Sequence, residues 1–332
     1  MSVAVVGGAG YIGAHVVDVL RARGEHVLVV DDLSTGDADR VPGLPLTRID
    51  VTDPTQVAPL ATAFRQHEVD AVVHLAARKR VDESVAHPTR YLRDNVAGLA
   101  NVLDAATAAD ARTVVLSSTA AVYGTPSAAG APVDESTPPR PENPYGTSKL
   151  ACEWLLEAHA RAHGVAATSL RYFNVAGAAR PALADRGTSN LVPIVLDRLR
   201  ADRAVEVFGG GLATRDGTPV RDYVHVVDVA EAHVVALDAL RSGRDVPAVV
   251  NLGTGEGSTV LEVVRAVARV LGVEPRVDVV ARRAGDPVSV VADVTLAGTA
   301  LGWRARLRLE DIAADAVRCD AGLTPELTDS SR

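Results

Sequence analysis

The sequence predicts an α/β protein, with a doubly wound parallel sheet followed by a smaller C-terminal α/β domain. Two observations favour this class. The first half of the chain alternates short runs of β-branched residues with helical segments that carry apolar side chains at i, i+3 and i+4. These runs are almost continuously apolar, as strands buried on both faces of a parallel sheet require. With 332 residues, of which 47% are hydrophobic, the chain is long enough for such a domain and a smaller one.

The expected elements are ordered along the chain. The strands of the main sheet are expected at Val3–Gly8, His26–Asp32, Pro45–Asp50, Asp70–Ala77, Arg112–Ser118 and Ala167–Val175. After Gly177 come glycine-, proline- and polar-rich loops, with helices expected at Asn190–Arg200, Val226–Leu240 and Thr259–Leu271. The run Ala248–Gly255 again reads as a buried strand. We expect a first domain over residues 1–176, to which about 222–255 return, and a second domain over 177–332.

Charge and cysteine content narrow the class of protein. A formal net charge of −8 with no extended basic cluster argues against nucleic-acid binding. The short basic run Arg78–Arg80 is instead suited to face a phosphate. Cys152 and Cys319 are too few for a disulfide framework, which favours a reducing cytoplasm. No secretory signal or long apolar stretch is visible, so no membrane association is expected.

A glycine pattern comes directly after the first strand. Gly7, Gly10 and Gly13 are spaced Gly-x-x-Gly-x-x-Gly between that strand and an apolar helix. Such spacing lets the backbone turn tightly and brings the N-terminus of the helix against a pyrophosphate, where its free N–H groups and dipole favour anionic oxygens. A merely tight turn is the alternative. At this strand-to-helix junction the pattern predicts a dinucleotide site.

Acidic residues end the next two strands. Asp31 lies about twenty residues past the glycines, the reach expected of an acid that binds a ribose. Its carboxylate would accept hydrogen bonds from the ribose hydroxyls and repel a 2′-phosphate, so NAD is favoured over NADP. A solvated acid at a strand end is the alternative. Asp50 and Val51, which close the third strand, are candidates for a border of the adenine.

The stretch PYGTSKLACE, from Pro144 to Glu153, places Tyr145 and Lys149 at i and i+4. On a helix that begins near Pro144 they share one face. A tyrosine is a poor base at neutral pH, but a nearby ammonium and the positive nicotinamide of NAD⁺ stabilise its phenolate. Lysine also donates to a nicotinamide ribose, and it is rare here, since Lys79 is the one other lysine. A surface lysine beside a buried tyrosine is the alternative.

Hydroxyl side chains end the fifth strand. Ser117, Ser118 and Thr119 stand at the edge where doubly wound sheets place their ligands. Any of them can equally cap a helix or a turn. Together with the tyrosine and the lysine, they predict a site where a proton and a hydride are moved.

These motifs resemble the extended short-chain dehydrogenase/reductase superfamily, in which the sheet is a Rossmann fold. The residues that carry this resemblance are the three glycines, Ser117–Thr119, Tyr145-x-x-x-Lys149 and Arg171–Asn174. Asn190–Pro193, the run DGTPVRDYVHVVDVAEAHV over Asp216–Val234, NLGTGEG and Arg282–Asp286 are similar to its UDP-glucose 4-epimerases (UDP-galactose 4-epimerases). The similarity runs from Val3 to about residue 320. It implies NAD as the cofactor, a UDP-sugar as the substrate, and a homodimer through the helices Arg90–Ala109 and Cys152–His163.

The resemblance also implies roles for individual residues. Tyr145 would be the acid/base on the sugar 4-hydroxyl, Lys149 its pKa tuner and ribose anchor, and Thr119 the catalytic hydroxyl that is usually a serine. Implied NAD contacts are Gly7, Gly10, Tyr11, Ile12, Gly13, Asp31, Asp32, Leu33, Asp50, Val51, Leu75, Ala76, Ala77, Lys79, Asn95, Ser117, Tyr145, Lys149, Tyr172 and Phe173. Implied substrate contacts are Thr119, Tyr145, Asn174, Asn190, Leu191, Val205, Val207, Phe208, Arg221, Arg283, Asp286 and Val290. Guanidinium forks such as those of Arg221 and Arg283 suit a diphosphate. No metal site is expected.

Related enzymes share the first oxidation at C4 but differ in the later steps. The resemblance to the 4,6-dehydratases includes Thr119, but those enzymes place Asp-Glu immediately after the threonine, and UDP-glucuronate decarboxylases tend to carry a nearby Glu. Here the next residues are Ala120 and Ala121, which transfer no proton. Epimerisation of UDP-glucose and UDP-galactose is therefore expected. The alternatives are epimerisation of another UDP-sugar, dehydration, and a non-catalytic NAD-binding regulator, a class that typically lacks the Tyr/Lys pair.

One position bears on the choice of sugar. Where the family often has a bulky tyrosine, this chain has Val290, counted from Asp286. We expect the smaller side chain to leave room for a 2-acetamido group, so that UDP-N-acetylglucosamine and UDP-N-acetylgalactosamine are also substrates. A valine in a strand is ordinarily part of a core or a sheet.

Overall fold

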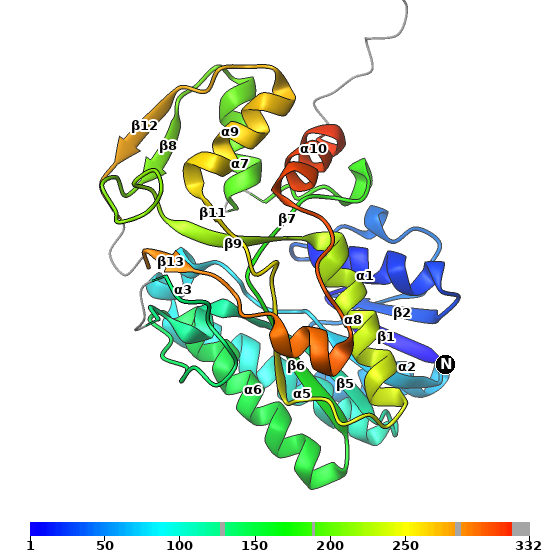
Figure 1. The fold of residues 1–332 in the computed structure, drawn as a ribbon. Helices are drawn as coiled ribbons and strands as arrows, with labels where there is room; N and C mark the ends of the chain where they lie inside the picture. Colours follow the sequence, from blue (N-terminus) through cyan, green and yellow to red (C-terminus); the bar gives the residue numbers. More distant parts are fainter. Residues whose placement is uncertain (127–129, 188–189, 283–286, 321–332) are drawn as a thin grey trace, which may run out of the picture.

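The computed structural model describes residues 1–126, 130–187, 190–282 and 287–320. Its centre is a seven-stranded parallel sheet in the order β10-β6-β5-β4-β1-β2-β3. Helices cover both faces, and a smaller group of strands and helices lies beyond the carboxyl ends of the strands (Figure 1). This confirms the predicted fold class.

The strands of the main sheet are β1 (Ser2–Val6), β2 (His26–Asp31), β3 (Leu46–Arg48), β4 (Val69–His74), β5 (Thr113–Thr119), β6 (Ala166–Tyr172) and β10 (Val249–Leu252). Its helices are α1 (Tyr11–Ala22), α2 (Val57–Gln66), α3 (Val81–Ala86), α4 (Pro88–Leu92), α5 (Gly98–Ala108), α6 (Pro144–His163) and α8 (Val226–Arg241). Strand β1 lies between β4 and β2, so the chain leaves the middle of the sheet in both directions. Ligands of doubly wound sheets bind in the crevice at this point.

Alternate residues of each central strand face opposite hydrophobic cores. Val3 and Val5 pack with residues of α1 and α8, whereas Ala4 and Val6 pack with residues of α2, α5 and α6. Burial on both faces explains the runs of consecutive apolar residues in the central strands.

In the part of the chain that the structure describes, the smaller group has two sheets and three α-helices. Strand β9 (Val220–His225) pairs with β7 (Asn174–Ala176), β11 (Gly257–Thr259) and β13 (Ser289–Val290), and β8 (Val205–Phe208) pairs with β12 (Val277–Val280). The helices are α7 (Leu191–Arg200), α9 (Val260–Leu271) and α10 (Leu309–Cys319). They share a separate core with Val205, Val207 and Tyr223.

The chain returns to the main sheet after it has entered the smaller group. Helix α8 packs against α1, and β10 pairs in parallel with β6, with Val249 opposite Ser169. Trp303 also packs in the core on the α1 side. Two expected elements differ in detail. The strand expected over Ala167–Val175 is divided at Phe173, because Asn174–Ala176 turns away to pair with β9. The helix expected over Arg90–Ala109 contains a π-helical turn at Arg93–Ala97.

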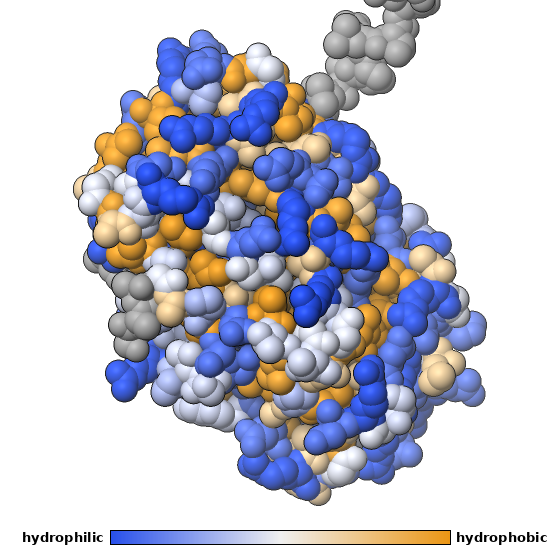
Figure 2. Space-filling model, viewed as in Figure 1, coloured by the Kyte–Doolittle hydropathy of each residue, from blue (hydrophilic) through white to orange (hydrophobic). Residues whose placement is uncertain are grey.

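The surface mixes hydrophilic and hydrophobic residues over the face drawn in Figure 2. Within the described ranges, no helix is long and apolar enough to span a bilayer. Cys152 and Cys319 are both buried and unpaired. The reducing compartment expected from them stays a prediction.

Candidate active site

A cavity of about 1360 Å³ runs along the carboxyl ends of the main-sheet strands, between the sheet and the smaller group. Its lining begins at the glycine turn after β1, passes the ends of β5 and β6 and the N-terminus of α6, and continues to α7, β8, β9 and β13. The cavity therefore joins the expected dinucleotide site to the expected substrate site.

The glycine turn leaves no room for side chains. Gly7 has a φ of +82°, and a Cβ added there would lie 2.6 Å from the main-chain nitrogen of Ala76. A Cβ on Gly13 would lie 2.1 Å from the oxygen of Gly7. Gly10 is the N-cap of α1, whose first N–H groups have no partner within the helix. The turn thus fits the pyrophosphate of a dinucleotide, which would lie against the N-terminus of α1.

Asp31 braces this turn. Its carboxylate is buried and accepts hydrogen bonds from the main-chain N–H groups of Ala9, at 3.0 Å, and Leu33, at 2.9 Å. Burial raises the pKa of Asp31, and the two hydrogen bonds oppose the rise. A carboxylate offers about four acceptor positions, so two remain for ribose hydroxyls.

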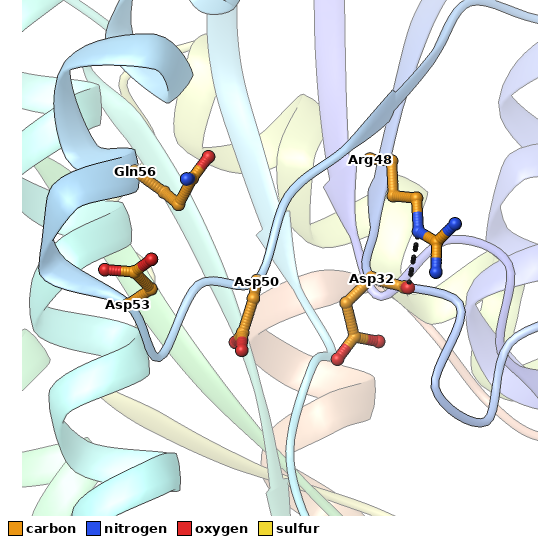
Figure 3. Close-up of a pocket in the computed structure, with 5 residues that line it drawn as sticks. All are labelled: Asp32, Arg48, Asp50, Asp53 and Gln56. Atoms are coloured by element: carbon orange, nitrogen blue, oxygen red, sulfur yellow. Dashed lines mark hydrogen bonds between the residues drawn. The ribbon is translucent and has the colours of Figure 1, made fainter.

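A shallow acidic pocket adjoins this end of the cavity (Figure 3). It is lined by Asp32, Arg48, Asp50, Asp53 and Gln56, on the last residue of β3 and the segments that come after β2 and β3. The Nε of Arg48 donates to the main-chain oxygen of Asp32 at 3.2 Å. Asp32 and Asp50 line both pockets. The border with the adenine that the sequence suggests for Asp50 stays a prediction.

The expected acid/base residues meet at the end of β5. Helix α6 begins at Pro144, and the Asn143 side chain caps it by accepting from the N–H of Gly146 at 2.9 Å. Lys149 is buried and its Nζ donates to the main-chain oxygen of Ser117 at 2.9 Å. The Thr119 hydroxyl accepts from the N–H of Ala121 at 3.2 Å, and its side chain interacts with the Tyr145 hydroxyl, whose pKa it lowers.

The sequence predicts that Lys149 lowers the pKa of Tyr145, but in the chain alone the pKa of Tyr145 is raised. Burial raises the pKa of Tyr145 to about 12, and the neighbouring Thr119 side chain only partly opposes this rise. Burial lowers the pKa of Lys149. Desolvation of the tyrosine therefore outweighs any help from the lysine, and a phenolate at neutral pH needs further positive charge in the cavity.

Asn95 lines the cavity with its amide already engaged. Its Oδ1 accepts from the N–H of Arg78 at 2.7 Å, and its Nδ2 donates to the oxygen of Arg78 at 3.1 Å and to Ser148 Oγ at 2.9 Å. Both amide hydrogens are used within the protein. Asn95 thus fastens the loop that carries Lys79 to helix α6.

The structure brings most of the expected site residues to one cavity. Its lining includes Gly7, Gly10, Tyr11, Ile12, Gly13, Asp31, Asp32, Asp50, Val51, Leu75, Ala76, Ala77, Lys79, Asn95, Ser117, Thr119, Tyr145, Lys149, Tyr172, Phe173, Asn174, Asn190, Leu191, Phe208, Arg221 and Val290.

Five expected residues are not among them. Val205 and Val207 point into the core of the smaller group because side chains alternate along β8, and their neighbour Phe208 reaches the cavity instead. Leu33 packs against the main core. Arg283 and Asp286 lie outside the described residues.

Other lining residues come from loops without a recognisable motif. Arg40 is buried beside the cavity, and its Nη2 donates to the main-chain oxygen of Ala184 at 3.0 Å. Asp185 lines the cavity and accepts from Asn190 Nδ2 at 2.5 Å. The polar loop that contains residue 185 is the only signal in the sequence, since its contact with the turn around residue 40 is tertiary.

A doubly wound sheet with a glycine turn at β1, and a Tyr–Lys pair facing the end of β5, defines the class of short-chain dehydrogenase/reductase proteins. Within the described ranges, no group of His, Cys, Asp or Glu side chains is placed to hold a metal ion. The chain belongs to the NAD-dependent epimerase/dehydratase family, whose model matches residues 3–253.

Individual proteins resemble the chain over nearly its full length. A UDP-glucose 4-epimerase of Lacticaseibacillus casei is 40% identical over 308 residues, which cover 92% of each chain. The crystal structure of a UDP-glucose 4-epimerase from Stenotrophomonas maltophila, with bound NAD and formylated UDP-arabinopyranose, has a TM-score of 0.90 and 39% identity over 96% of this chain and 97% of its own. A UDP-Glc/GlcNAc 4-epimerase of Campylobacter jejuni has a TM-score of 0.82 and 32% identity, over 95% and 97%.

Proposed function

We propose that this chain is an NAD-dependent UDP-glucose 4-epimerase, which interconverts UDP-glucose and UDP-galactose through a transient 4-keto sugar. The observation that carries the proposal is the meeting of Tyr145, Lys149 and Thr119 in the middle of a cavity that has a dinucleotide turn at one end. The relatives support it, since they carry this name and match more than nine tenths of the chain.

Residues of the chain transfer the proton and position the sugar hydroxyl. Tyr145 takes the proton of the sugar 4-hydroxyl, and Thr119, which lines the cavity beside it, orients that hydroxyl with its own. Lys149 holds the strand end through Ser117 and has donors left for a ribose. NAD, when bound, supplies the hydride acceptor and donor for C4 and a positive ring that lowers the pKa of Tyr145.

Epimerisation needs a sugar that turns while its nucleotide stays fixed. Asn190, Leu191, Phe208 and Arg221 line the far end of the cavity and are the proposed UDP contacts. Binding of the non-reacting UDP then holds the reacting carbon within reach of Tyr145 on either sugar face. Return of the proton and hydride to the opposite face gives the C4 epimer with no net redox change.

The lining of the sugar site disfavours dehydration. Ala120 and Ala121, which line the cavity after Thr119, have no proton to transfer. Glu142 also lines it, but its carboxylate accepts hydrogen bonds from Thr125, from the N–H at 3.2 Å and the hydroxyl at 3.0 Å. Both carboxylate oxygens of Glu142 therefore bind the loop at Thr125, so we do not assign it as a base for C5 or C6 of the sugar.

A wider choice of sugar is a second proposal, and it rests on Val290. Its side chain lines the cavity and packs in a small core with Phe173. A valine at this place leaves more space than a tyrosine would, so we propose that 2-acetamido sugars are also turned over. The name of the Campylobacter jejuni relative, a UDP-Glc/GlcNAc 4-epimerase, is consistent with this.

A homodimer is the third proposal. Two large apolar side chains are exposed on helices that pack together, Leu92 on α4 and Trp154 on α6. Trp154 is 61% exposed, which is costly for a large apolar side chain that stays in water. Two copies of this face would cover them.

The proposed function is tested with purified protein and no added cofactor. UDP-galactose and UDP-N-acetylgalactosamine are incubated separately, and the C4 epimers are resolved by chromatography. Conversion of both supports the epimerase and the open sugar site, and conversion of UDP-galactose alone supports only the first. Tyr145→Phe should abolish conversion while NAD remains bound. If neither sugar is converted after NAD is supplied, the proposed function is wrong.

A further inference from the structure

Three successive turns of α6 hold three consecutive residues at the end of β5. The side chain of Tyr145 interacts with that of Thr119, and Lys149 donates to the oxygen of Ser117 at 2.9 Å. One turn further along, Glu153 accepts a hydrogen bond from the hydroxyl of Ser118. The spacing i, i+4, i+8 places all three helical side chains on one face. The catalytic contacts of the first two therefore share a single strand end with the third.

Glu153 is itself fixed by an ion pair with Arg171. The Nε and Nη2 of Arg171 donate to the two carboxylate oxygens of Glu153 at 2.9 and 2.6 Å. The side chains of Arg171 and Glu153 are only 5% and 4% exposed. Arg171 lies on β6 directly opposite Ser118 on β5. Two adjacent strands and the catalytic helix are thus joined at one buried carboxylate.

The pair also has a supporting neighbour. Arg171 Nη1 donates to the hydroxyl of Tyr123 at 2.8 Å, and that hydroxyl donates to Asn251 Oδ1 at 2.7 Å. Each of the three guanidinium nitrogens therefore has an acceptor, so the orientation of the group is determined by the surrounding structure. A bidentate arginine–carboxylate pair is among the most directional contacts available in a protein.

We propose that Glu153 and Arg171 are positioning residues for the epimerase reaction. By holding the Ser118 hydroxyl, the pair keeps the end of β5 in register with α6, so that Thr119 meets Tyr145 and the Ser117 oxygen meets Lys149. A buried ion pair is seldom the best way to gain stability, because its desolvation offsets much of its attraction. Its directionality suits a strand end that must place two catalytic contacts at once. The inference rests on the proposed function.

The test separates positioning from stability. Ser118→Ala removes only the hydroxyl that links β5 to Glu153 and leaves the ion pair intact, and Glu153→Gln replaces the charged acceptor by a neutral one. Both should lower kcat for UDP-galactose about ten- to a hundred-fold, since small misplacements of catalytic groups have effects of this size. KM should stay within about two-fold, because the UDP contacts are on other elements. The kcat of the double variant, Ser118→Ala with Glu153→Gln, should be no lower than that of Glu153→Gln alone, because both changes break the same hydrogen bond.

Arg241→Gln is the matched control. Arg241 forms a comparable ion pair with Asp70, with two contacts of 2.9 Å and a side chain that is 10% exposed, on elements away from α6. It should lower the melting temperature and leave kcat unchanged. If Ser118→Ala and a folded Glu153→Gln keep the wild-type kcat, the inference is wrong. Ser118→Ala decides alone if Glu153→Gln does not fold. An inactive wild type in the same assay would instead contradict the proposed function.

Discussion

Lys149 Nζ donates a hydrogen bond of 2.9 Å to the main-chain oxygen of Ser117. This contact joins a buried ammonium on α6 to the strand that carries Thr119, and it leaves the other N–H groups of the lysine for the cavity. The acceptor is a main-chain atom, so no substitution at residue 117 removes it. The geometry depends on the compact, flexible head group of the lysine.

Arginine should not replace this lysine. Lys149→Arg keeps the charge but forces a planar fork with five N–H donors into a site that holds one buried ammonium. We expect Lys149→Arg and Lys149→Met to lower kcat for UDP-galactose by about a hundred-fold or more, the range of a lost acid/base contribution. Steady-state rates across pH check this. Arg161→Gln, which breaks an exposed ion pair with Glu157 on the same helix, should have wild-type kcat.

Asp31 should govern the choice between NAD and NADP. Asp31→Ser removes an acceptor of ribose hydroxyls and the charge that repels a 2′-phosphate. We expect NAD affinity to fall about ten-fold or more, as for the loss of a hydrogen bond to a charged group, and NADP affinity to approach it. Calorimetric titration of both nucleotides measures the change. Asp53, which lines the shallow pocket but not the main cavity, supplies the control Asp53→Ser. If Asp31→Ser binds NADP no better than the wild type does, the prediction is wrong.

Val290→Tyr should narrow the choice of sugar. The larger ring would occupy the cavity near Phe173, so turnover of UDP-N-acetylgalactosamine should fall by at least about ten-fold relative to UDP-galactose. A difference of one methylene in an apolar pocket is worth about 1–3 kcal/mol of discrimination, and the added ring takes up more space than that. The ratio of kcat/KM for the two sugars is the measurement, with Val290→Ile as the milder control. An unchanged ratio would remove Val290 from the sugar site.

The protein should lose stability in acid. Burial lowers the pKa of His15 to about 4, that of His233 to about 4 and that of His74 to about 3. An unfolded chain, with histidine pKa values near 6.5, binds these protons first, so the stabilisation present above pH 6.5 is lost as the pH falls toward 4. Each proton changes the free energy of unfolding by about 1.4 kcal/mol per pH unit.

Urea unfolding at several pH values tests this. Between pH 6.5 and 4, His233→Gln should reduce the slope of the free energy of unfolding against pH by the equivalent of about one proton. Substitution of the exposed His87 should leave that slope unchanged. A pH-independent free energy of unfolding over that window would show that the three histidines take up protons in the folded protein.

Trp154→Glu should disrupt the proposed homodimer. A charge introduced on the exposed apolar face of α6 would be buried without a partner if two copies meet there. Analytical ultracentrifugation of the wild type and the variant measures the effect. We expect a dimer to become a monomer with its melting behaviour otherwise preserved. Substitution of Val279, which is exposed on β12, is the control. Trp303→Phe would not serve, because Trp303 is buried. A monomeric wild type would contradict the proposal.

Much of the site could be predicted because its signals are local. The glycines at β1, the spacing of Tyr145 and Lys149, and the hydroxyl residues at the end of β5 each reflect the geometry of one turn, one helix face or one strand end. The mistaken expectation for two residues of β8 also has a local cause. Val205 and Val207 were expected at the substrate, but the register of β8 turns them inward and leaves Phe208 at the cavity.

The alternation of strands and helices, and the chemistry of the residues at the strand ends, could be read directly from the chain, since both depend on neighbours in sequence. Packing decides which strands lie together and which charges meet. The contact of Arg40 with Ala184, the pairing of Glu153 with Arg171 and the high pKa of Tyr145 all depend on distant segments and on burial. Burial and long-range pairing are properties of the packed chain, and no local pattern of residues specifies them.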